Sequence, residues 1–362
     1  MVKIGLRKIN GILILIIALI AIFYFGEPFL KPILLAFFFA TLMKPVCNLF
    51  EKWGIGRVIA SLFCTIIVFL GVSGLIILII GQASQFADDI PKMADEVREF
   101  IPEVQKKIAS STGISKSQQS KFFEDQSEGI AEGLQTYIQG ALSNLFTTLG
   151  HFFLTLVYLF LFLIHRTKFK KVILSYVPKS NRDQGREVIA KSATVSHHYL
   201  WGRIKVMTIL GIMYLIAFLA FDIRYALLFT VLGALITIIP YIGPLLSGVL
   251  PVAFALLEGN TTTYMLLFAG VILVIQLIES YILEPWIIGN EVSLTPLFII
   301  IAIIIGGMLW GILGMILFVP LFAIIKIIFD HIKKLRPLAF LMSNVDDDSV
   351  SKKGKKQKEY LI

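Results

Sequence analysis

Residues 58–81 read VIASLFCTIIVFLGVSGLIILIIG, a run without a single charged side chain. A run of this length is enough for an α-helix to cross the roughly 30 Å of hydrocarbon in a lipid bilayer. Within lipid, every backbone N–H and C=O group needs a hydrogen-bond partner, and a helix supplies these partners from within the segment. Strands of a membrane barrel would be shorter and would alternate apolar with polar residues. The stretch therefore predicts a transmembrane helix.

Apolar runs of the same kind recur along the whole chain. We place them at residues 9–25, 28–46, 58–81, 146–165, 204–221, 225–257, 263–283 and 296–329. The composition agrees, because 57% of the residues are hydrophobic and only 16% are charged, whereas soluble domains are about half apolar and about a quarter charged. We predict an all-α, polytopic transmembrane protein with about eight apolar segments.

The distribution of charge predicts how these segments are oriented. The net charge is +9, but the basic residues lie in short stretches beside apolar segments, which is the pattern of membrane orientation and not of nucleic-acid binding. The N-terminus, the 44–57 loop, region 166–205 and the C-terminus are basic, whereas region 82–145 carries ten carboxylates against six bases. We therefore expect a cytoplasmic (inner) membrane protein with both termini inside and residues 82–145 outside.

The outside region has apolar positions spaced three and four residues apart over 83–108 and again over 129–145, which predicts two amphipathic helices. We expect these helices to form a structural cap or a contact between copies in a homo-oligomer, or alternatively a lid over a pore mouth.

We divide the chain into 1–81 as N-terminal membrane helices, 82–145 as an extracytoplasmic helical region, 146–165 as one membrane helix, 166–205 as a basic cytoplasmic region, 206–332 as a C-terminal membrane domain and 333–362 as a disordered, basic cytoplasmic tail.

Two apolar segments are too long for a single perpendicular span. Residues 225–257 and 296–329 would each extend about 50 Å at 1.5 Å per residue. Both contain helix breakers, and each is therefore either a tilted, kinked helix or a re-entrant hairpin. Interrupted apolar segments point to a transporter's binding site, because unwound backbone is tolerated in the membrane where it lines a cavity. The breakers are Pro240, Tyr241, Gly243 and Pro244 in the first segment, and Gly306, Gly307, Gly311, Gly314 and Pro320 in the second.

Few polar side chains lie within the apolar segments. Gln276 and Glu279 are three residues apart and share one helix face, with Glu284 just beyond. An ionisable residue inside a membrane helix is costly and indicates a functional role, unless Glu279 lies near the headgroups and is solvated. No nucleophile motif, Walker loop or metal-ligand spacing occurs. We therefore predict no enzymatic activity, no cofactor, no metal and a small-molecule or ion substrate besides the lipid bilayer itself.

The C-terminal half contains several short motifs in a fixed order: residues 238–246 (IIPYIGPLL), 256–259 (LLEG), 284–289 (EPWIIG), 294–297 (LTPL), the glycines of 306–314 and residues 319–321 (VPL). In this order the motifs resemble those of the AI-2E family of transporters, also called autoinducer-2 exporters. Leu200-Trp201-Gly202-Arg203 is similar to the family's aromatic-Gly-basic start of the fifth span. The order of segments also matches over essentially the whole chain.

The resemblance implies export or exchange of a small solute such as autoinducer-2 or another small polar metabolite by a secondary-type mechanism. Some relatives are described as monovalent cation/proton antiporters and some as sporulation-associated membrane proteins, so antiport and a non-transporting scaffold stay open, as does a passive channel. Relatives often have a histidine where this chain has Thr295, which argues against proton handling there. Besides the breakers and the polar residues above, we expect the pathway to include Pro285, Gly289, Thr295 and Pro296.

Overall fold

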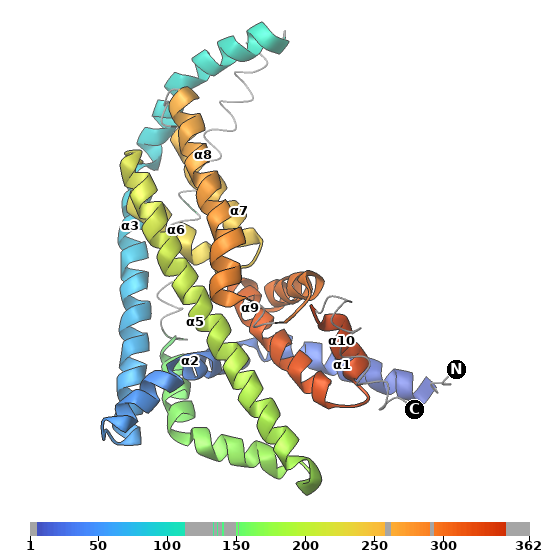
Figure 1. Ribbon diagram of the computed structural model, residues 1–362. Coiled ribbons are helices and arrows are strands. Elements are labelled where there is room, and N and C mark those ends of the chain that lie inside the picture. Colours follow the sequence, from blue (N-terminus) through green and yellow to red (C-terminus); the bar gives the residue numbers. More distant parts are fainter. Residues whose placement is uncertain are drawn as a thin grey trace. The chain divides into compact units, whose positions relative to one another are not determined.

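The computed structural model describes residues 6–112, 152–257, 262–289 and 293–344, with a few single positions between 133 and 150. Apart from one isolated β-bridge, the regular structure of these residues is helical. The helices are α1 (Leu6–Phe25), α2 (Glu27–Lys52), α3 (Arg57–Thr112), a helix over Phe152–Ser175, the short η1 (Lys179–Asn181), α5 (Arg182–Ala220), α6 (Ala226–Ile236), α7 (Ile242–Leu257), α8 (Thr262–Ile278), η2 (Glu279–Ile288), α9 (Pro296–His331) and α10 (Arg336–Met342) (Figure 1).

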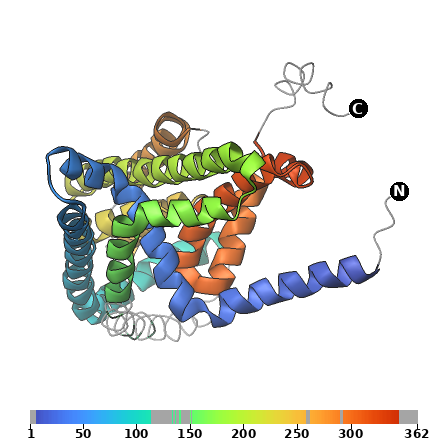
Figure 2. The same ribbon diagram turned by 90° about the horizontal axis from the view of Figure 1, so that it is seen from below.

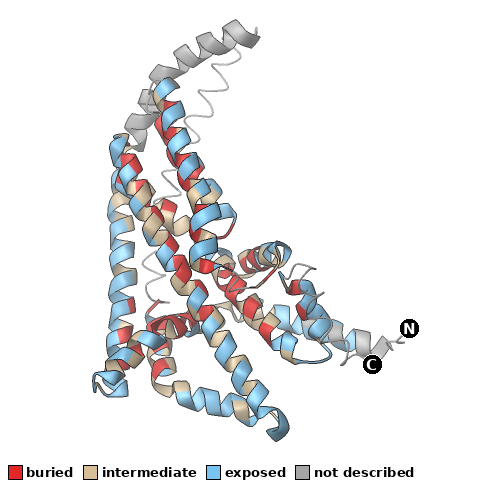
Figure 3. Ribbon diagram, in the orientation of Figure 1, coloured by how far each residue is buried: buried red, intermediate tan, exposed pale blue. Residues whose placement is uncertain are grey.

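Six of these helices are long and apolar enough to cross a membrane: Glu27–Lys52, Arg57–Asp89, Phe152–Ser175, Lys179–Ala220, Thr263–Ile288 and Pro296–His331. Their apolar side chains are largely exposed in the isolated chain, as the pale colour along α3 shows (Figure 3). Only 11% of the apolar window of α3 is buried. Such a surface would be unstable in water and is suited to lipid, where apolar side chains need no polar cover. The prediction of an all-α, multi-pass membrane protein is confirmed.

The chain divides into two compact units, which are described separately below. The first contains residues 1–66, 154–202 and 288–362, and the second contains residues 67–153 and 203–287. The predicted amphipathic helix over 83–108 is continuous with the preceding span, because α3 extends from Arg57 to Thr112. Much of the basic region 166–205 is helical as well, since α5 begins at Arg182. The predicted helix over 129–145 and the tail beyond Asn344 lie outside the described residues.

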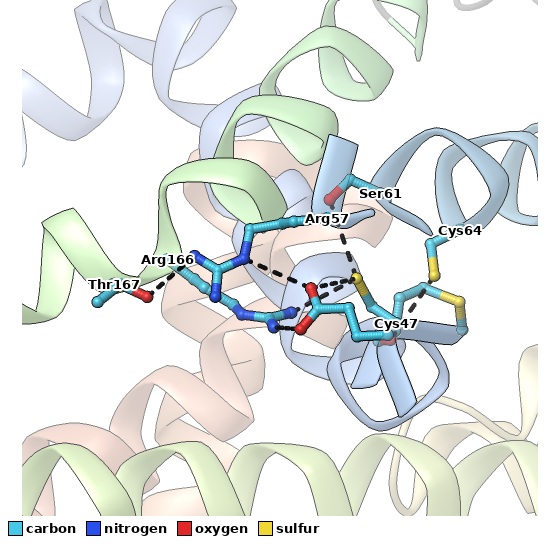
Figure 4. A network of polar contacts seen from close by, with 8 residues as sticks. Cys47, Arg57, Ser61, Cys64, Arg166 and Thr167 are labelled. Atoms are coloured by element: carbon cyan, nitrogen blue, oxygen red, sulfur yellow. Dashed lines mark hydrogen bonds and ion pairs between the residues drawn. The ribbon is translucent and has the colours of Figure 1, made fainter. Parts of the chain in front are cut away.

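In the first unit, polar contacts join the end of α2 and the start of α3 to the middle of the helix Phe152–Ser175. Glu51 of α2 accepts a hydrogen bond from Arg166 at 2.5 Å and lies 3.4 Å from the Nε atom of Arg57 at the start of α3. Arg166 also donates to the Sγ atom of buried Cys47 at 3.4 Å, and Arg57 donates to Thr167 at 3.3 Å (Figure 4). Hydrogen bonds between charged partners are stronger than neutral ones, so this network fixes α2 against its two neighbours.

The longest apolar segment of the first unit, α9, folds back on itself. Gly311 has a backbone conformation (φ 64°, ψ −145°) that lies outside the helical region and that residues with a side chain rarely adopt. On either side of it, Gly306 and Gly314 are in backbone contact, although eight residues of straight helix would separate them by about 12 Å. The two arms of α9 therefore lie side by side as a helical hairpin (Figure 2).

The start of this hairpin is tied to the end of α10, and its tip is anchored to α1. Leu294 and Ser343 form an antiparallel bridge, and the Thr295 N–H donates to the Met342 carbonyl oxygen at 2.9 Å. At the tip, the indole N–H of Trp310 donates to the Phe23 carbonyl oxygen of α1 at 2.9 Å. The first arm, residues 296–310, is only about 22 Å long at 1.5 Å per residue. This arm is too short to cross the hydrocarbon unaided.

The second unit contains the other interrupted segment, and it too is a helical hairpin. Helix α6 ends at Ile236 and α7 begins at Ile242, and these two helices pack against each other. With 11 and 16 residues, they extend about 16 and 24 Å. Aromatic rings hold the hairpin to α3, since Phe86 packs against Tyr225 and Phe254 at centroid distances of 5.2 and 5.9 Å. The predicted break around Pro240 is confirmed.

Candidate functional site

In the second unit, a part-buried ion pair joins α5 to η2. Arg203 in α5 has a side chain that is only 6% exposed, and its Nη1 atom lies 2.6 Å from an Oε atom of Glu284. The same nitrogen donates to the Thr237 carbonyl oxygen at 3.4 Å. Because Thr237 caps the C-terminus of α6, the guanidinium also lies at the negative end of a helix dipole. The buried guanidinium of Arg203 is therefore stabilised by the Glu284 carboxylate and by the C-terminal end of α6 together.

Glu279 lies within electrostatic range of this pair and is the most unusual residue of the unit. Its side chain is completely buried. Neither carboxyl oxygen has a hydrogen-bond partner among the residues that the structure describes. Both Arg203 and Glu284 act on it electrostatically. A carboxylate without a hydrogen bond is costly to bury, which makes Glu279 a candidate for a functional role.

The backbone around Glu279 is itself irregular. Residues Glu279–Ile288 form π-helical turns that continue α8, and they include Glu284 and Pro285. Proline lacks the N–H group that donates the i→i−4 hydrogen bond of a regular α-helix, and the wider π-helical turns accommodate this missing donor. π-Helical segments inside membrane helices are rare and frequently mark functional sites. The two carboxylates are therefore presented by one irregular segment.

The break between α6 and α7 faces the same helix through Gln276. The amide nitrogen of Gln276 donates to the Pro244 carbonyl oxygen at 2.7 Å. This approach requires Gly248 on α7, because a Cβ atom there would overlap the Gln276 side-chain amide. The turn itself needs Gly243, whose Cβ would overlap backbone atoms of residues 236–237. Two glycines therefore allow α7 to approach both the preceding helix end and α8.

A second hydrogen-bonded chain reaches the same break from α5. The buried hydroxyl groups of Tyr214 and Ser247 are 3.0 Å apart, and Ser247 donates to the Pro244 carbonyl oxygen at 3.1 Å. The Pro244 carbonyl therefore receives hydrogen bonds from two side chains. Glu279 also acts electrostatically on Tyr214. The polar cluster formed by Arg203, Tyr214, Ser247, Gln276, Glu279 and Glu284 connects α5, α7 and α8–η2, and we call it the carboxylate cluster.

The residues predicted as a pathway are divided between the two units. The second unit brings together Gln276, Glu279, Glu284, Pro285 and the break residues Pro240, Tyr241, Gly243 and Pro244, of which Tyr241 is exposed and adopts a positive φ of 66°. The first unit contains the remainder: Gly289, with φ 54°, Thr295 and Pro296 at the start of α9, Gly306, Gly311 and Gly314 at its turn, and Gly307 and Pro320 on its arms. The participation of all of these in transport stays a prediction.

Sequence reasoning missed three members of the cluster. By sequence, Arg203 groups with the basic residues of a cytoplasmic loop. Its position directly before the apolar run 204–221, close to Trp201, was a signal that it could lie at the start of a membrane helix. Tyr214 and Ser247 each lie within apolar segments and gave no signal of their own. Their roles follow only from the packing of helices that are distant in sequence.

The carboxylate cluster combines one guanidinium group with two carboxyl groups. Arg203 carries one positive charge, and Glu284 and Glu279 carry up to two negative charges, so the cluster gains one net negative charge when Glu279 is ionised. A proton or a monovalent cation would restore neutrality. Among the described residues no group of three or more His, Cys, Asp or Glu side chains is arranged to hold a metal ion.

Comparisons with known proteins identify the family. The profile of AI-2E family transporters matches residues 13–334. The chain is 26% identical over 349 residues to TqsA of Escherichia coli (strain K12), named as an AI-2 transport protein, which covers 95% of this chain and 97% of TqsA. It is 27% identical over 316 residues to YrrI of Bacillus subtilis (strain 168), named as a predicted transport protein, which covers 84% of this chain and 87% of YrrI.

The matched region includes both helical hairpins and the whole carboxylate cluster. The similarity extends over 97% of TqsA and 87% of YrrI. Together with six helices long enough to cross a membrane, these findings show that the chain belongs to the AI-2E family of transporters.

Proposed function

We propose that this chain is a secondary-type transporter that exports or exchanges a small polar solute across the cytoplasmic membrane. The name of TqsA as an AI-2 transport protein makes an autoinducer-2-like molecule the first solute to test, with other small polar metabolites next. We further propose that both termini lie inside, that the α6–α7 and α9 hairpins are re-entrant, and that the protein is a homo-oligomer. The charge asymmetry of the sequence and the short hairpin arms support the topology.

The observation that carries the proposal is the buried Glu279 carboxyl beside the Arg203–Glu284 pair. It is completely buried and lacks a hydrogen bond in the described chain. The ionised form is therefore unfavourable unless the surroundings change, for example by admitting water, a cation or the solute. Binding of a proton at Glu279 would consequently be linked to the state of the pathway. This linkage is what couples a solute to an ion gradient.

The proposal is tested with Glu279→Gln in proteoliposomes. The amide keeps the shape of the side chain but cannot ionise, so we expect solute flux that no longer responds to a pH gradient, with unchanged membrane insertion. Glu187→Gln is the matched control, because Glu187 is an exposed residue of α5 that pairs with Lys191; its flux should stay at the wild-type level. Wild-type pH dependence in the Glu279→Gln protein would refute the coupling role.

The same carboxyl also suits a monovalent cation/proton antiporter, which is the second candidate function. An antiporter would move Na⁺ or Li⁺ against protons without any organic solute, and its cation flux would require Glu279. Measuring cation-dependent dissipation of a pH gradient in vesicles without solute distinguishes the two candidates. A non-transporting scaffold would give no flux in either assay and would instead respond to deletion of residues 110–120 through loss of a bound partner.

A further inference from the structure

The end of α9 and the short α10 form a surface that the carboxylate cluster does not involve. After His331 the chain turns and α10 packs back against α9, burying Ala339 and Met342. The backbone of Met342 accepts a hydrogen bond from Thr295, and the Asn344 N–H donates to the Ser293 carbonyl oxygen at 3.2 Å. The position of α10 is therefore fixed against both ends of the α9 hairpin.

The turn before α10 presents positive charge without acidic partners. Lys333, Lys334 and Arg336 are all exposed. In the described part of the chain none of the three forms an ion pair, since the nearby Asp330 pairs with Lys326 at 3.3 Å. The Nε–H group of Arg336 donates a hydrogen bond to the Asp330 carbonyl oxygen at 3.2 Å. The remaining N–H groups of its guanidinium are available to other acceptors. The turn thus has three cations available to an external anion.

Beside these cations, α10 exposes apolar side chains that α9 does not cover. Leu338 and Leu341 are 49% and 60% exposed, and Phe340 is 59% exposed. At 100° per residue, Leu338 lies beside Met342 at the edge of the buried face, whereas Phe340 and Leu341 lie on the side of the helix opposite Ala339 and Met342. The apolar face of α10 is consequently wider than its contact with α9. A helix with this division lies in a membrane interface, with its apolar side toward the acyl chains.

We propose that α10 and the basic turn before it bind anionic phospholipid headgroups. The cations would contact lipid phosphates while Leu338, Phe340 and Leu341 enter the acyl boundary, which joins the two attractions that hold interfacial helices. A protein partner fits less well, because the cores of protein interfaces are depleted in lysine. Since α10 is hydrogen-bonded to Thr295, a bound lipid also fixes the start of α9.

The test compares phosphatidylglycerol with phosphatidylcholine as probes, using native mass spectrometry of the purified full chain to titrate lipid binding. Each basic residue at an anionic surface contributes roughly fivefold to binding. We therefore expect Lys333→Gln/Lys334→Gln/Arg336→Gln to weaken phosphatidylglycerol binding at least about tenfold and to leave phosphatidylcholine binding unchanged. The matched control removes the same charge from exposed lysines on the helix Phe152–Ser175, as Lys168→Gln/Lys170→Gln/Lys171→Gln. Lys333→Arg/Lys334→Arg should retain wild-type binding.

Several outcomes would overturn the proposal. Equal loss in both glutamine triples would show a general effect of net charge, and no loss in either would show that lipid binds elsewhere. Inorganic phosphate that displaces the lipid fully, with Leu338→Ser/Leu341→Ser binding phosphatidylglycerol normally, would identify a free-anion site instead. A change of subunit number in the Lys333→Gln/Lys334→Gln/Arg336→Gln protein, without loss of lipid affinity, would identify a contact between copies of the chain.

Discussion

The α9 hairpin depends on two glycines whose backbones touch, and this contact yields a quantitative prediction. A Cβ atom placed on Gly314 would overlap the carbonyl group of Gly306, and the reverse substitution would overlap Gly314 in the same way. Both obstacles are backbone atoms that belong to helical arms, so no side-chain rotation relieves them. Gly314→Ala must therefore separate the arms or distort the turn at Gly311.

The size of the effect follows from two opposing contributions. Inserting a methyl group into a packed contact costs about 1–3 kcal/mol. Replacing glycine by alanine inside a helix contributes about 1 kcal/mol in the other direction, because alanine loses less backbone freedom. An alanine placed in open space receives only the favourable contribution. Gly314→Ala should therefore be about 1–3 kcal/mol less stable than an alanine substitution at an unobstructed helical glycine.

The chain supplies both controls that this comparison needs. Gly270 in α8 has no atom within 4 Å of an added Cβ, so Gly270→Ala should match or exceed the wild-type apparent Tm. At Gly307 the nearest atom is the Cε of Met315 at 2.7 Å, the end of a flexible side chain, so Gly307→Ala should be nearly neutral. Apparent Tm is measured in one detergent by loss of the monodisperse peak on size-exclusion chromatography.

We expect Gly314→Ala to fall a few degrees below Gly270→Ala, at about 2–4 °C per kcal/mol for a domain of this size. Equal apparent Tm values for these two proteins would refute the close contact, and with it the reversal of α9. A lowered apparent Tm for Gly307→Ala but not for Gly314→Ala would mean that the tight contact between the two arms of α9 lies at Gly307 and not at Gly314.

Two further predictions concern the other hairpin and the membrane topology. Gly248→Ala should displace the Gln276 amide from the Pro244 carbonyl oxygen at little cost in apparent Tm, because only a side chain has to move; we expect solute flux in proteoliposomes to fall at unchanged protein yield, and normal flux would show that the contact is dispensable. If both hairpins are re-entrant, single cysteines at Asn260 and Asn290, in a background without the two native cysteines, should label from outside and inside respectively, whereas the reverse labelling would mean that both segments span.

Much of the fold could be predicted because the length of an apolar run is visible in consecutive residues of the sequence. The run at residues 58–81 and the absence of charge within it are sufficient to identify a span. The breaks in 225–257 and 296–329 were also visible, since Pro240, Gly243 and Gly311 disrupt a helix wherever they occur. The direction of the chain after each break was not visible, because a kink and a reversal need the same residues. In α9 the contact between Gly306 and Gly314 distinguishes them, and in 225–257 the packing of α6 against α7 does so.

The site was less predictable, because its members meet across helices. Gln276 and Glu279 could be selected from the sequence, since polar groups are conspicuous in an apolar run. Their partners could not be selected in this way. Most backbone carbonyl groups and many serine hydroxyl groups form hydrogen bonds within their own helix, and nothing in the sequence distinguishes the Pro244 carbonyl or the Ser247 hydroxyl from these. The continuous helix from Arg57 to Thr112 shows the same limit, since polarity alone predicted a change of element where the backbone has none.

Arg203 shows where counting charges needs a structural correction. The orientation prediction assigns it to the inside surface with the other bases of residues 166–205, yet its guanidinium is buried against Glu284. A buried, paired cation says little about which side of the membrane a loop faces. Removing it still leaves nine of the ten bases against Asp183 and Glu187, so the predicted orientation does not depend on it. If the carboxylate cluster couples transport as proposed, a neutral substitution of Arg203 should impair flux without inverting the protein.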